Sequence, residues 1–214
     1  MKGDGHHDAT AVRSRSDSGF GLTEFLMSTL VCLVFASMLF GLLVEIQRKA
    51  SYQAEVQSVL NNTRLAMQTV GRYLRQAGND PLGIGVSGIT ITSPTELRVE
   101  SDLTGSGSPS SPDKGDPDGD TLDSGERITI RFNSASRSLE TVTGNGAVQI
   151  IAGSISDILF RCYDSAGNPA IAGGDIRRVN VTISGASLLK DPTTRRRFGV
   201  QLHSDFEIQC ERKG

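Results

Sequence analysis

The sequence predicts an α+β fold in which one long N-terminal α-helix, with a membrane-spanning first half, packs on an antiparallel β-sheet. Three observations predict this fold. A segment of 20 uncharged residues, 25–44, contains 16 apolar residues. Apolar residues then recur at spacings of three and four as far as residue 77, and beyond Pro81 they alternate with polar residues. The chain therefore divides into a polar N-terminal segment (1–19), an apolar helical half (20–45), an amphipathic helical half (46–78) and a β-rich domain (79–214).

The charge balance excludes one class of function. Lys and Arg number 22 against 24 Asp and Glu, which gives a net charge of -2. A general nucleic-acid binder needs a clustered cationic surplus, so we expect no nucleic-acid partner. Hydrophobic residues make up 37% of the chain and Trp is absent. With so many of these residues in one segment, the remainder suits a single modest, polar domain.

The apolar segment 25–44 predicts a membrane helix. Twenty helical residues span roughly 30 Å, the thickness of a bilayer's hydrocarbon core. A cleaved secretory signal would require a small-residue cleavage site after Val44, but a continuing helical pattern follows instead. Cations lie near both ends of the segment, so their count alone does not decide the topology.

One carboxylate lies directly before the apolar segment. Glu24 follows the sequence Gly19-Phe20-Gly21-Leu22-Thr23, and a charge at this position is costly unless it is paired or near the interface. If the chain were cut between Gly19 and Phe20, the new α-amine would lie about one helical turn from Glu24. A neighbouring subunit could then pair its amine with this carboxylate in an apolar environment.

This arrangement resembles the class III signal of type IV prepilins: Gly19-Phe20, then Leu22 and Glu24, then the apolar segment. The resemblance implies that residues 1–19 are a leader peptide, removed after Gly19 by the prepilin peptidase, which also N-methylates Phe20. It implies that Glu24 docks subunits into a filament. Gly21 departs from the common Thr or Ser. The alternative is a chance match before an ordinary membrane anchor.

The helix continues without proline from Phe20 to about Ala77 and stops at Gly78-Asn79-Asp80-Pro81, which supplies a C′ glycine and then a proline. Its end, Gly71-Arg72-Tyr73-Leu74-Arg75-Gln76-Ala77-Gly78, resembles that of PilW-like minor pilins. This second resemblance narrows the interpretation from pilins in general to the PilW-like branch. J-type secretion pseudopilins, which end this helix with a similar Leu-Arg-Gln sequence, are the alternative.

Membership of that branch implies a pilin-like fold and a minor pilin that primes or caps a type IV pilus. The implied partners are other major and minor pilins, the prepilin peptidase, the inner-membrane assembly machinery and, before assembly, the lipid bilayer. The implied location is the bacterial inner membrane, with a single span and the C-terminal domain in the periplasm. After assembly it is the pilus or cell surface.

Beyond Pro81, alternation predicts half-buried antiparallel strands covered on one face by the amphipathic helix. The alternating runs are 89–91, 97–99, 128–132, 179–183 and 198–202, separated by turn signals such as Gly144-Asn145-Gly146. Cys162 and Cys210 lie on strand-like segments of the exported part, where one bridge would close a 49-residue loop. This bridge would stabilise the domain by roughly 4 kcal/mol. The alternative is two free, buried thiols.

Residues 105–126 form an acidic, low-complexity loop. Carboxylates at alternating positions around a glycine can wrap oxygen ligands about Ca²⁺, which makes calcium a candidate cofactor. The candidate ligands are Asp116, Asp118, Asp120, Asp123 and Glu126. The positions of Gly119 and Glu126 do not fit an EF-hand. The alternative is a solvated loop in which these residues serve turn chemistry.

No catalytic pattern is present in the sequence, so we expect no enzyme. His6 and His7 lie in the leader, and His203 stands alone on a predicted strand. Nucleophile-elbow and phosphate-binding glycine motifs are missing. Arg195-Arg196-Arg197 is typical of a solvated turn, with contact to an acidic neighbouring subunit or to DNA as the alternative. The leading hypothesis is a minor pilin; the others are a J-type pseudopilin and a membrane-anchored metal- or ligand-binding module.

Overall fold

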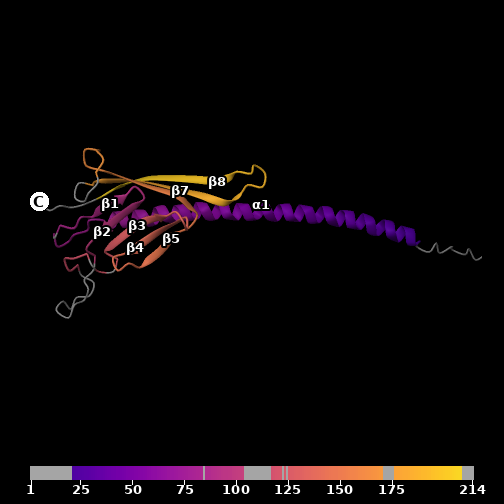
Figure 1. Cartoon of the computed structure of the whole chain (residues 1–214), viewed down its shortest axis with the longest axis horizontal. Helices are drawn as coiled ribbons and strands as arrows, with labels where there is room; N and C mark the ends of the chain where they lie inside the picture. The colour runs from indigo at the N-terminus through magenta and orange to yellow at the C-terminus, as the bar shows by residue number, and fades with distance from the viewer. Residues whose placement is uncertain are drawn as a thin grey trace, which may run out of the picture. The chain divides into compact units, whose positions relative to one another are not determined.

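The computed structural model describes residues 21–83, 85–103, 117–121, 123, 125–170 and 176–208. These residues form one helix, α1 (Leu22–Gln76), followed by eight β-strands (Figure 1). The predicted α+β class, with a long N-terminal helix and antiparallel strands, is confirmed. By its internal contacts the chain divides into two units, Met1–Gln47 and Arg48–Gly214, and α1 contributes residues to both.

The part of α1 in the second unit buries one face. Val59, Ala66, Val70 and Leu74 are fully buried at the three- and four-residue spacing of a helix face. Thr63 is buried on the same face, where its hydroxyl donates a hydrogen bond to the Val59 carbonyl (2.7 Å). The amphipathic pattern of the sequence therefore corresponds to a real buried stripe.

The end of α1 has the geometry that its glycine predicts. Gly78 has a φ of 72°, a left-handed conformation that glycine adopts without a steric penalty. Its N–H donates to the carbonyl of Glu100 at 2.9 Å. The Asn79 side chain donates to the Asp102 carbonyl at 2.9 Å. These bonds join the end of the helix to the last residue of the second strand and to the segment that follows it.

The strands form two antiparallel sheets, not the single sheet that the alternation predicts. The five-stranded sheet contains, in this order, β1 (Ile89–Ser93), β2 (Glu96–Glu100), β3 (Arg127–Asn133), β4 (Ser138–Thr143) and β5 (Val148–Ala152). The three-stranded sheet contains β6 (Ile155–Tyr163), β7 (Arg178–Lys190) and β8 (Arg197–Glu207). The break comes at Gly153 and Ser154, where Ser154 has a φ of 60° and the chain leaves one sheet for the other.

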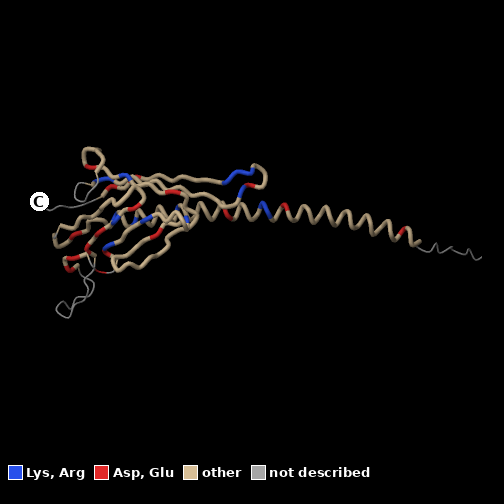
Figure 2. Tube along the Cα trace, in the orientation of Figure 1, with Lys and Arg blue, Asp and Glu red and all other residues tan. Residues whose placement is uncertain are grey.

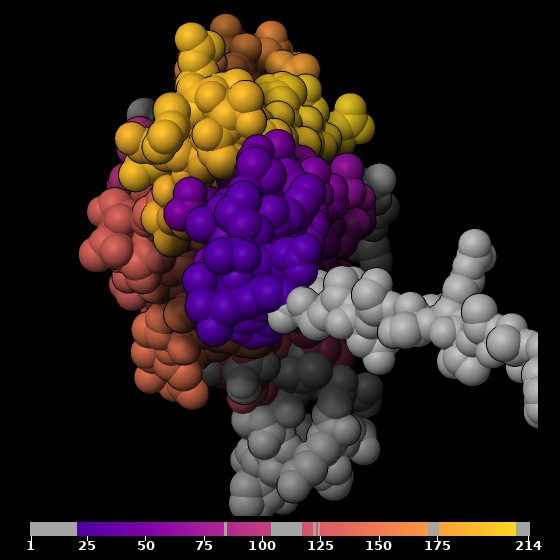
Figure 3. Space-filling view, turned by 90° about the vertical axis from the view of Figure 1, so that its right-hand side faces the viewer, coloured from indigo at the N-terminus to yellow at the C-terminus, as the bar shows by residue number. Residues whose placement is uncertain are grey.

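One hydrophobic core joins both sheets to the helix. Ile130 and Leu139 come from the five-stranded sheet, Val181 and Ile183 from the three-stranded sheet, and Leu74 from α1. Figure 1 shows the second half of α1 passing between the β7–β8 pair and the five-stranded sheet. In Figure 3, β8 and β5 lie on opposite sides of the domain. The helix is therefore a central element of this unit.

Two glycines let α1 approach the β7–β8 pair closely. A Cβ atom on Gly71 of the helix would lie 2.6 Å from Cε1 of Phe206 on β8. A Cβ atom on Gly185 of β7 would lie 2.3 Å from Oγ1 of Thr63. No real Cβ makes such contacts, so only glycine permits this packing distance at either position.

Candidate assembly and membrane segment

The first unit presents an apolar helical surface that nothing within the described chain covers. Residues 22–43 are exposed apart from half-buried Thr29, and Phe25, Phe35 and Phe40 are 59%, 63% and 68% exposed. The helix is long and apolar enough to cross a membrane. Water does not tolerate an exposed apolar surface of this size, so lipid or another protein must cover it.

Three hydroxyl side chains in this segment form hydrogen bonds within the helix. The hydroxyls of Ser28, Thr29 and Ser37 donate to the carbonyls of Glu24, Leu26 and Val34, at 2.5, 2.9 and 2.7 Å. Such bonds to the preceding turn remove the cost of placing a hydroxyl in hydrocarbon. Burial of these three hydroxyls in lipid or in a helical bundle therefore carries little penalty.

Glu24 lies in the first turn of α1 and is the only charged residue from 22 to 44. Its Oε2 accepts a hydrogen bond from the Gly21 N–H at 3.1 Å. The first N–H groups of a helix lack partners within the helix, and the helix dipole favours a negative charge there. The carboxylate is thus held at the helix start, while its side chain stays exposed. Gly19 and Phe20 lie outside the described residues, so cleavage and N-methylation stay predictions.

Only one of the two cysteines of the predicted bridge lies among the described residues. Cys162 lies on β6 with an exposed fraction of 3%, and burial raises the pKa of its thiol to about 12. Cys210 lies outside the described residues. The Cys162–Cys210 bridge therefore stays a prediction.

The acidic loop closes on a buried glutamate. Glu126 is 1% exposed; its Oε1 accepts the Leu103 N–H at 2.8 Å and its Oε2 accepts the Asp123 N–H at 3.2 Å. Asp118 Oδ1 accepts the Asp120 N–H at 3.2 Å. These bonds are turn chemistry of the kind that the alternative interpretation expects. Asp116 lies outside the described residues.

Sequence reasoning missed one member of this cluster. Asp102 is fully buried; its Oδ2 accepts the Gly119 N–H at 3.2 Å, while its Oδ1 has no hydrogen-bond partner. Asp123 Oδ2 is likewise buried without a partner. Burial, and then repulsion from Glu126 and Asp118, raises the pKa of Asp102. An acidic residue just after a strand, beside an acidic loop, is the signal that could have found it.

Calcium binding stays a prediction. Among the described side chains, no three His, Cys, Asp or Glu are placed so as to hold a metal ion. Desolvation, and then the charge of Asp118, raises the pKa of Asp123. A cation would relieve this repulsion, but its binding would require the carboxylates to rearrange.

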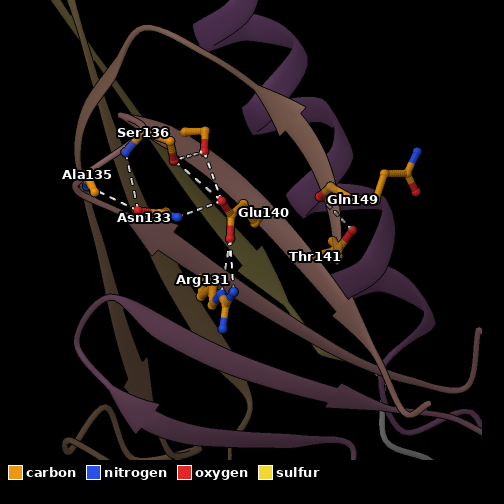
Figure 4. Close-up of polar contacts among 8 residues, drawn as sticks. Arg131, Asn133, Ala135, Ser136, Glu140, Thr141 and Gln149 are labelled. Atoms are coloured by element: carbon orange, nitrogen blue, oxygen red, sulfur yellow. Dashed lines mark hydrogen bonds and ion pairs between the residues drawn. The ribbon is translucent and has the colours of Figure 1, made fainter. Parts of the chain in front are cut away.

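A second polar cluster, around Glu140 on β4, is fully satisfied (Figure 4). Arg131 donates to Oε2 at 3.1 Å, and Asn133 and Ser138 donate to Oε1 at 2.8 and 3.2 Å. Burial opposes ionisation, but the hydrogen bonds from Asn133 and Arg131 outweigh it and lower the pKa of Glu140. With every acceptor occupied, this cluster joins the β3–β4 hairpin and offers no site for a ligand.

His203 lies on the exposed face of the β7–β8 pair. Its Nε2 is 2.8 Å from Asn180 Nδ2, and its Nδ1 is 3.1 Å from Thr182 Oγ1. Because an amide nitrogen only donates, Nε2 accepts and Nδ1 carries the proton that bonds Thr182. Asp205 Oδ2 lies 4.0 Å from Nε2 of His203. This is a cross-strand polar ladder on an exposed sheet.

No family model matches this sequence, and no curated protein matches it. The functional assignment therefore rests on the residues and their placement in the fold. The features that carry it are an exposed apolar helical half, a carboxylate at its start, and a second helical half built into a folded domain.

Proposed function

We propose that this chain is a PilW-like minor pilin of a type IV pilus. The prepilin peptidase cleaves it between Gly19 and Phe20 and methylates the new amine. The chain then joins other pilins through the first half of α1, and it primes or caps the filament. Its domain lies in the periplasm before assembly and on the pilus afterwards.

The observation that carries this proposal is the continuity of α1. One helix of 55 residues contributes an exposed apolar half and then a half whose buried face belongs to the core of the domain. An anchor that only tethers a domain needs no such continuity, because a flexible linker would serve. A filament subunit does need it, because the helix that packs in the filament must also fix the position of the domain.

The position of Glu24 supports the same function. It is the one charged residue from 22 to 44, and its carboxylate accepts a single described hydrogen bond, from the Gly21 N–H at 3.1 Å. Inside a bundle of apolar helices an unpaired carboxylate is heavily penalised. The amine of a neighbouring subunit would satisfy it and would fix the axial stagger between two helices.

Two other functions are consistent with the same helix. A J-type pseudopilin of a type II secretion system shares the signal and the helix, and it differs in the assembly it joins. A single-pass anchored module that binds a metal or ligand would use the acidic residues around Asp102 and would keep residues 1–19.

N-terminal sequencing of the membrane-purified chain separates these functions. We expect the mature chain to begin at Phe20 and its N-terminal peptide to carry one added methyl group by mass spectrometry. An intact leader would refute both pilin assignments and favour the anchored module. Purification of the assembled filament then separates the pilus from the secretion system.

The Glu24→Ala variant tests assembly itself. The variant would leave the amine of the neighbouring subunit without its carboxylate partner, and an unpaired charge in an apolar environment costs several kcal/mol. We therefore expect incorporation into sheared filaments to fall at least about tenfold. Membrane insertion, measured by resistance to carbonate extraction, should be unchanged. Thr23→Ala is the matched control, since it alters the neighbouring polar residue and keeps the carboxylate. Equal incorporation of the two variants would contradict the docking role.

A further inference from the structure

The end of the β7–β8 hairpin combines exposed leucines with exposed cations. Leu188 and Leu189 are 61% and 49% exposed. Exposed basic residues flank the turn that follows them: Lys190, Arg195, Arg196 and Arg197. Figure 2 shows blue stretches on both sides of the turn at this end of the hairpin, with one red stretch between them. We call residues 188–197 the hairpin end.

The backbone of the hairpin end is held in place. The Glu55 carboxylate of α1 accepts the N–H of Leu188 at 2.5 Å and that of Leu189 at 3.0 Å. In the turn, the Asp191 side chain accepts the Thr193 N–H at 2.7 Å, and the Asp191 N–H donates to the Arg196 carbonyl at 2.8 Å. The carboxylates of Glu55 and Asp191 are thereby engaged with backbone donors. The leucine and arginine side chains of the hairpin end remain exposed.

The hairpin end also lies beside the first turns of the folded unit. Glu55 joins it to the first turns of the folded unit, which begins at Arg48. Lys49 acts electrostatically on Asp191. Lys49 follows Val44 by five residues, so the chain itself keeps it within about 18 Å of the end of the segment, whatever the orientation of the domain. Lys49 thus adds a further cation near the hairpin end.

We propose that the hairpin end docks on the surface of an anionic bilayer before assembly. Leu188 and Leu189 enter the interface, and Lys190 with the three arginines binds lipid phosphates. This inference rests on the membrane anchoring in the proposed function, and it does not depend on cleavage or on pilus membership. Apolar residues beside cations, close to a membrane anchor, match the two components of an anionic bilayer surface.

A single fluorophore can test the docking, because the chain contains no Trp. The full-length Leu188→Trp variant is reconstituted in vesicles of phosphatidylcholine containing about one third phosphatidylglycerol, and in vesicles of phosphatidylcholine alone. Flotation first establishes that the chain is inserted. In the anionic vesicles we expect blue-shifted emission that brominated phosphatidylcholine quenches. In the neutral vesicles we expect both effects to be largely lost.

Two further measurements identify the cause. Each cation near an anionic surface changes the ratio of docked to free hairpin roughly fivefold, so adding R195Q, R196Q and R197Q should lower it about 100-fold and abolish the quenching. Raising the salt concentration of the unmodified reporter to about 0.5 M, which shortens the Debye length, should weaken docking without any further mutation. The control reporter is Ile150→Trp, on the edge strand β5, where the replaced side chain is equally exposed at 62%. It should not be quenched.

Several outcomes would overturn the proposal. Equal quenching of both reporters would mean that the whole domain adheres without specificity. If the emission of Leu188→Trp is neither blue-shifted nor quenched in either kind of vesicle, the hairpin end stays in water. If the arginine variants lost filament incorporation while their emission never depended on lipid, the partner would be an acidic subunit surface instead. Failure of the chain to float would refute the anchoring, whereas an uncleaved but docked chain would refute only the pilin function.

Discussion

Thr63 of α1 and Gly185 of β7 are in direct contact, and the contact leaves no space for a side chain on the strand. A Cβ atom at Gly185 would lie 2.3 Å from Thr63 Oγ1 and 3.0 Å from Val59 Cγ1. Thr63 Oγ1 is itself held by its bond to the Val59 carbonyl. The second half of α1 therefore packs directly on the three-stranded sheet, with the Thr63 side chain against the backbone of Gly185.

We expect Gly185→Ala to destabilise the domain by about 1–3 kcal/mol, because overpacking a core forces side chains or backbone to shift. Urea denaturation of the full-length chain in detergent, followed by circular dichroism, measures this change. Gly199→Ala is the matched control on the paired strand β8, where the nearest atom to an added Cβ is 3.9 Å away. Equal denaturation midpoints for the two variants would contradict the tight contact.

Local sequence patterns predict the elements whose apolar residues recur with a single period. They miss the features that depend on which strands pair with one another. Val179, Val181 and Ile183 alternate with polar residues and are all buried on β7. In contrast, β4 buries Leu139 on one face and Glu140 on the other, so its sequence shows no apolar alternation. The division into two sheets depends on the Gly153–Ser154 turn, whose positive φ at a serine has no sequence signature.

The same distinction explains the candidate sites. Glu24 was found because its spacing from Phe20 and the apolar segment is a local pattern. Asp102 was missed because its neighbours are brought to it by strand register. For example, the backbone N–H of Ser101 donates to the carbonyl of Glu126 at 3.0 Å, although 25 positions separate the two residues. Clusters assembled in this way cannot be read from spacing along the chain.

Glu140 should make the domain sensitive to acid. Its pKa is lowered in the folded state, so its contribution to stability is present above the unfolded pKa and is lost as the pH falls through the folded pKa. We expect Glu140→Gln to destabilise the domain by roughly 1–3 kcal/mol at pH 7 and to differ less from the unmodified chain in acid. Denaturation midpoints at several pH values test this. A difference that stays constant with pH would contradict the ionised network.

Asp102 should have the opposite pH dependence. Its pKa is raised, so the folded state binds its proton more tightly, and the contribution of this group to stability increases as the pH falls through the folded pKa. We therefore expect Asp102→Asn to raise the melting temperature at pH 7 in the absence of a cation. Asp157→Asn, on the exposed face of β6, is the control and should change little. A lower melting temperature for Asp102→Asn would show that its carboxylate stabilises the loop.

Calcium provides a second test of this cluster. If the acidic loop binds Ca²⁺, millimolar calcium should raise the melting temperature of the unmodified chain, because a ligand that binds only the folded state stabilises it. The Asp123→Asn variant should lose this increase, and Asp157→Asn should keep it. No heat of binding in calorimetry, together with no thermal shift, would refute the calcium prediction.

The cysteine prediction needs care because Cys162 is buried. With a thiol pKa of about 12, a free Cys162 would resist alkylation in the folded chain, so lack of labelling does not prove a bridge. The exported chain should be unfolded in denaturant with an alkylating reagent and without reductant. Mass spectrometry should then find Cys162 joined to Cys210, and two alkylated thiols would refute the bridge.

The Glu55 contact should control how firmly the hairpin end is held. Its carboxylate accepts the N–H groups of both Leu188 and Leu189, and each bond to a charged acceptor is worth about 1.5–3 kcal/mol where water is excluded, and less at this exposed position. We expect Glu55→Ala to increase hydrogen exchange at these two amides roughly tenfold, since a tenfold change corresponds to about 1.4 kcal/mol. The amide of Val181, deep in the same strand, should exchange at its original rate. If both regions changed together, the variant would have loosened the whole sheet, and Glu55 would be part of the core packing and not a local clamp. Unchanged exchange at Leu188 and Leu189 would mean that the turn at Asp191 holds the hairpin end without help from α1.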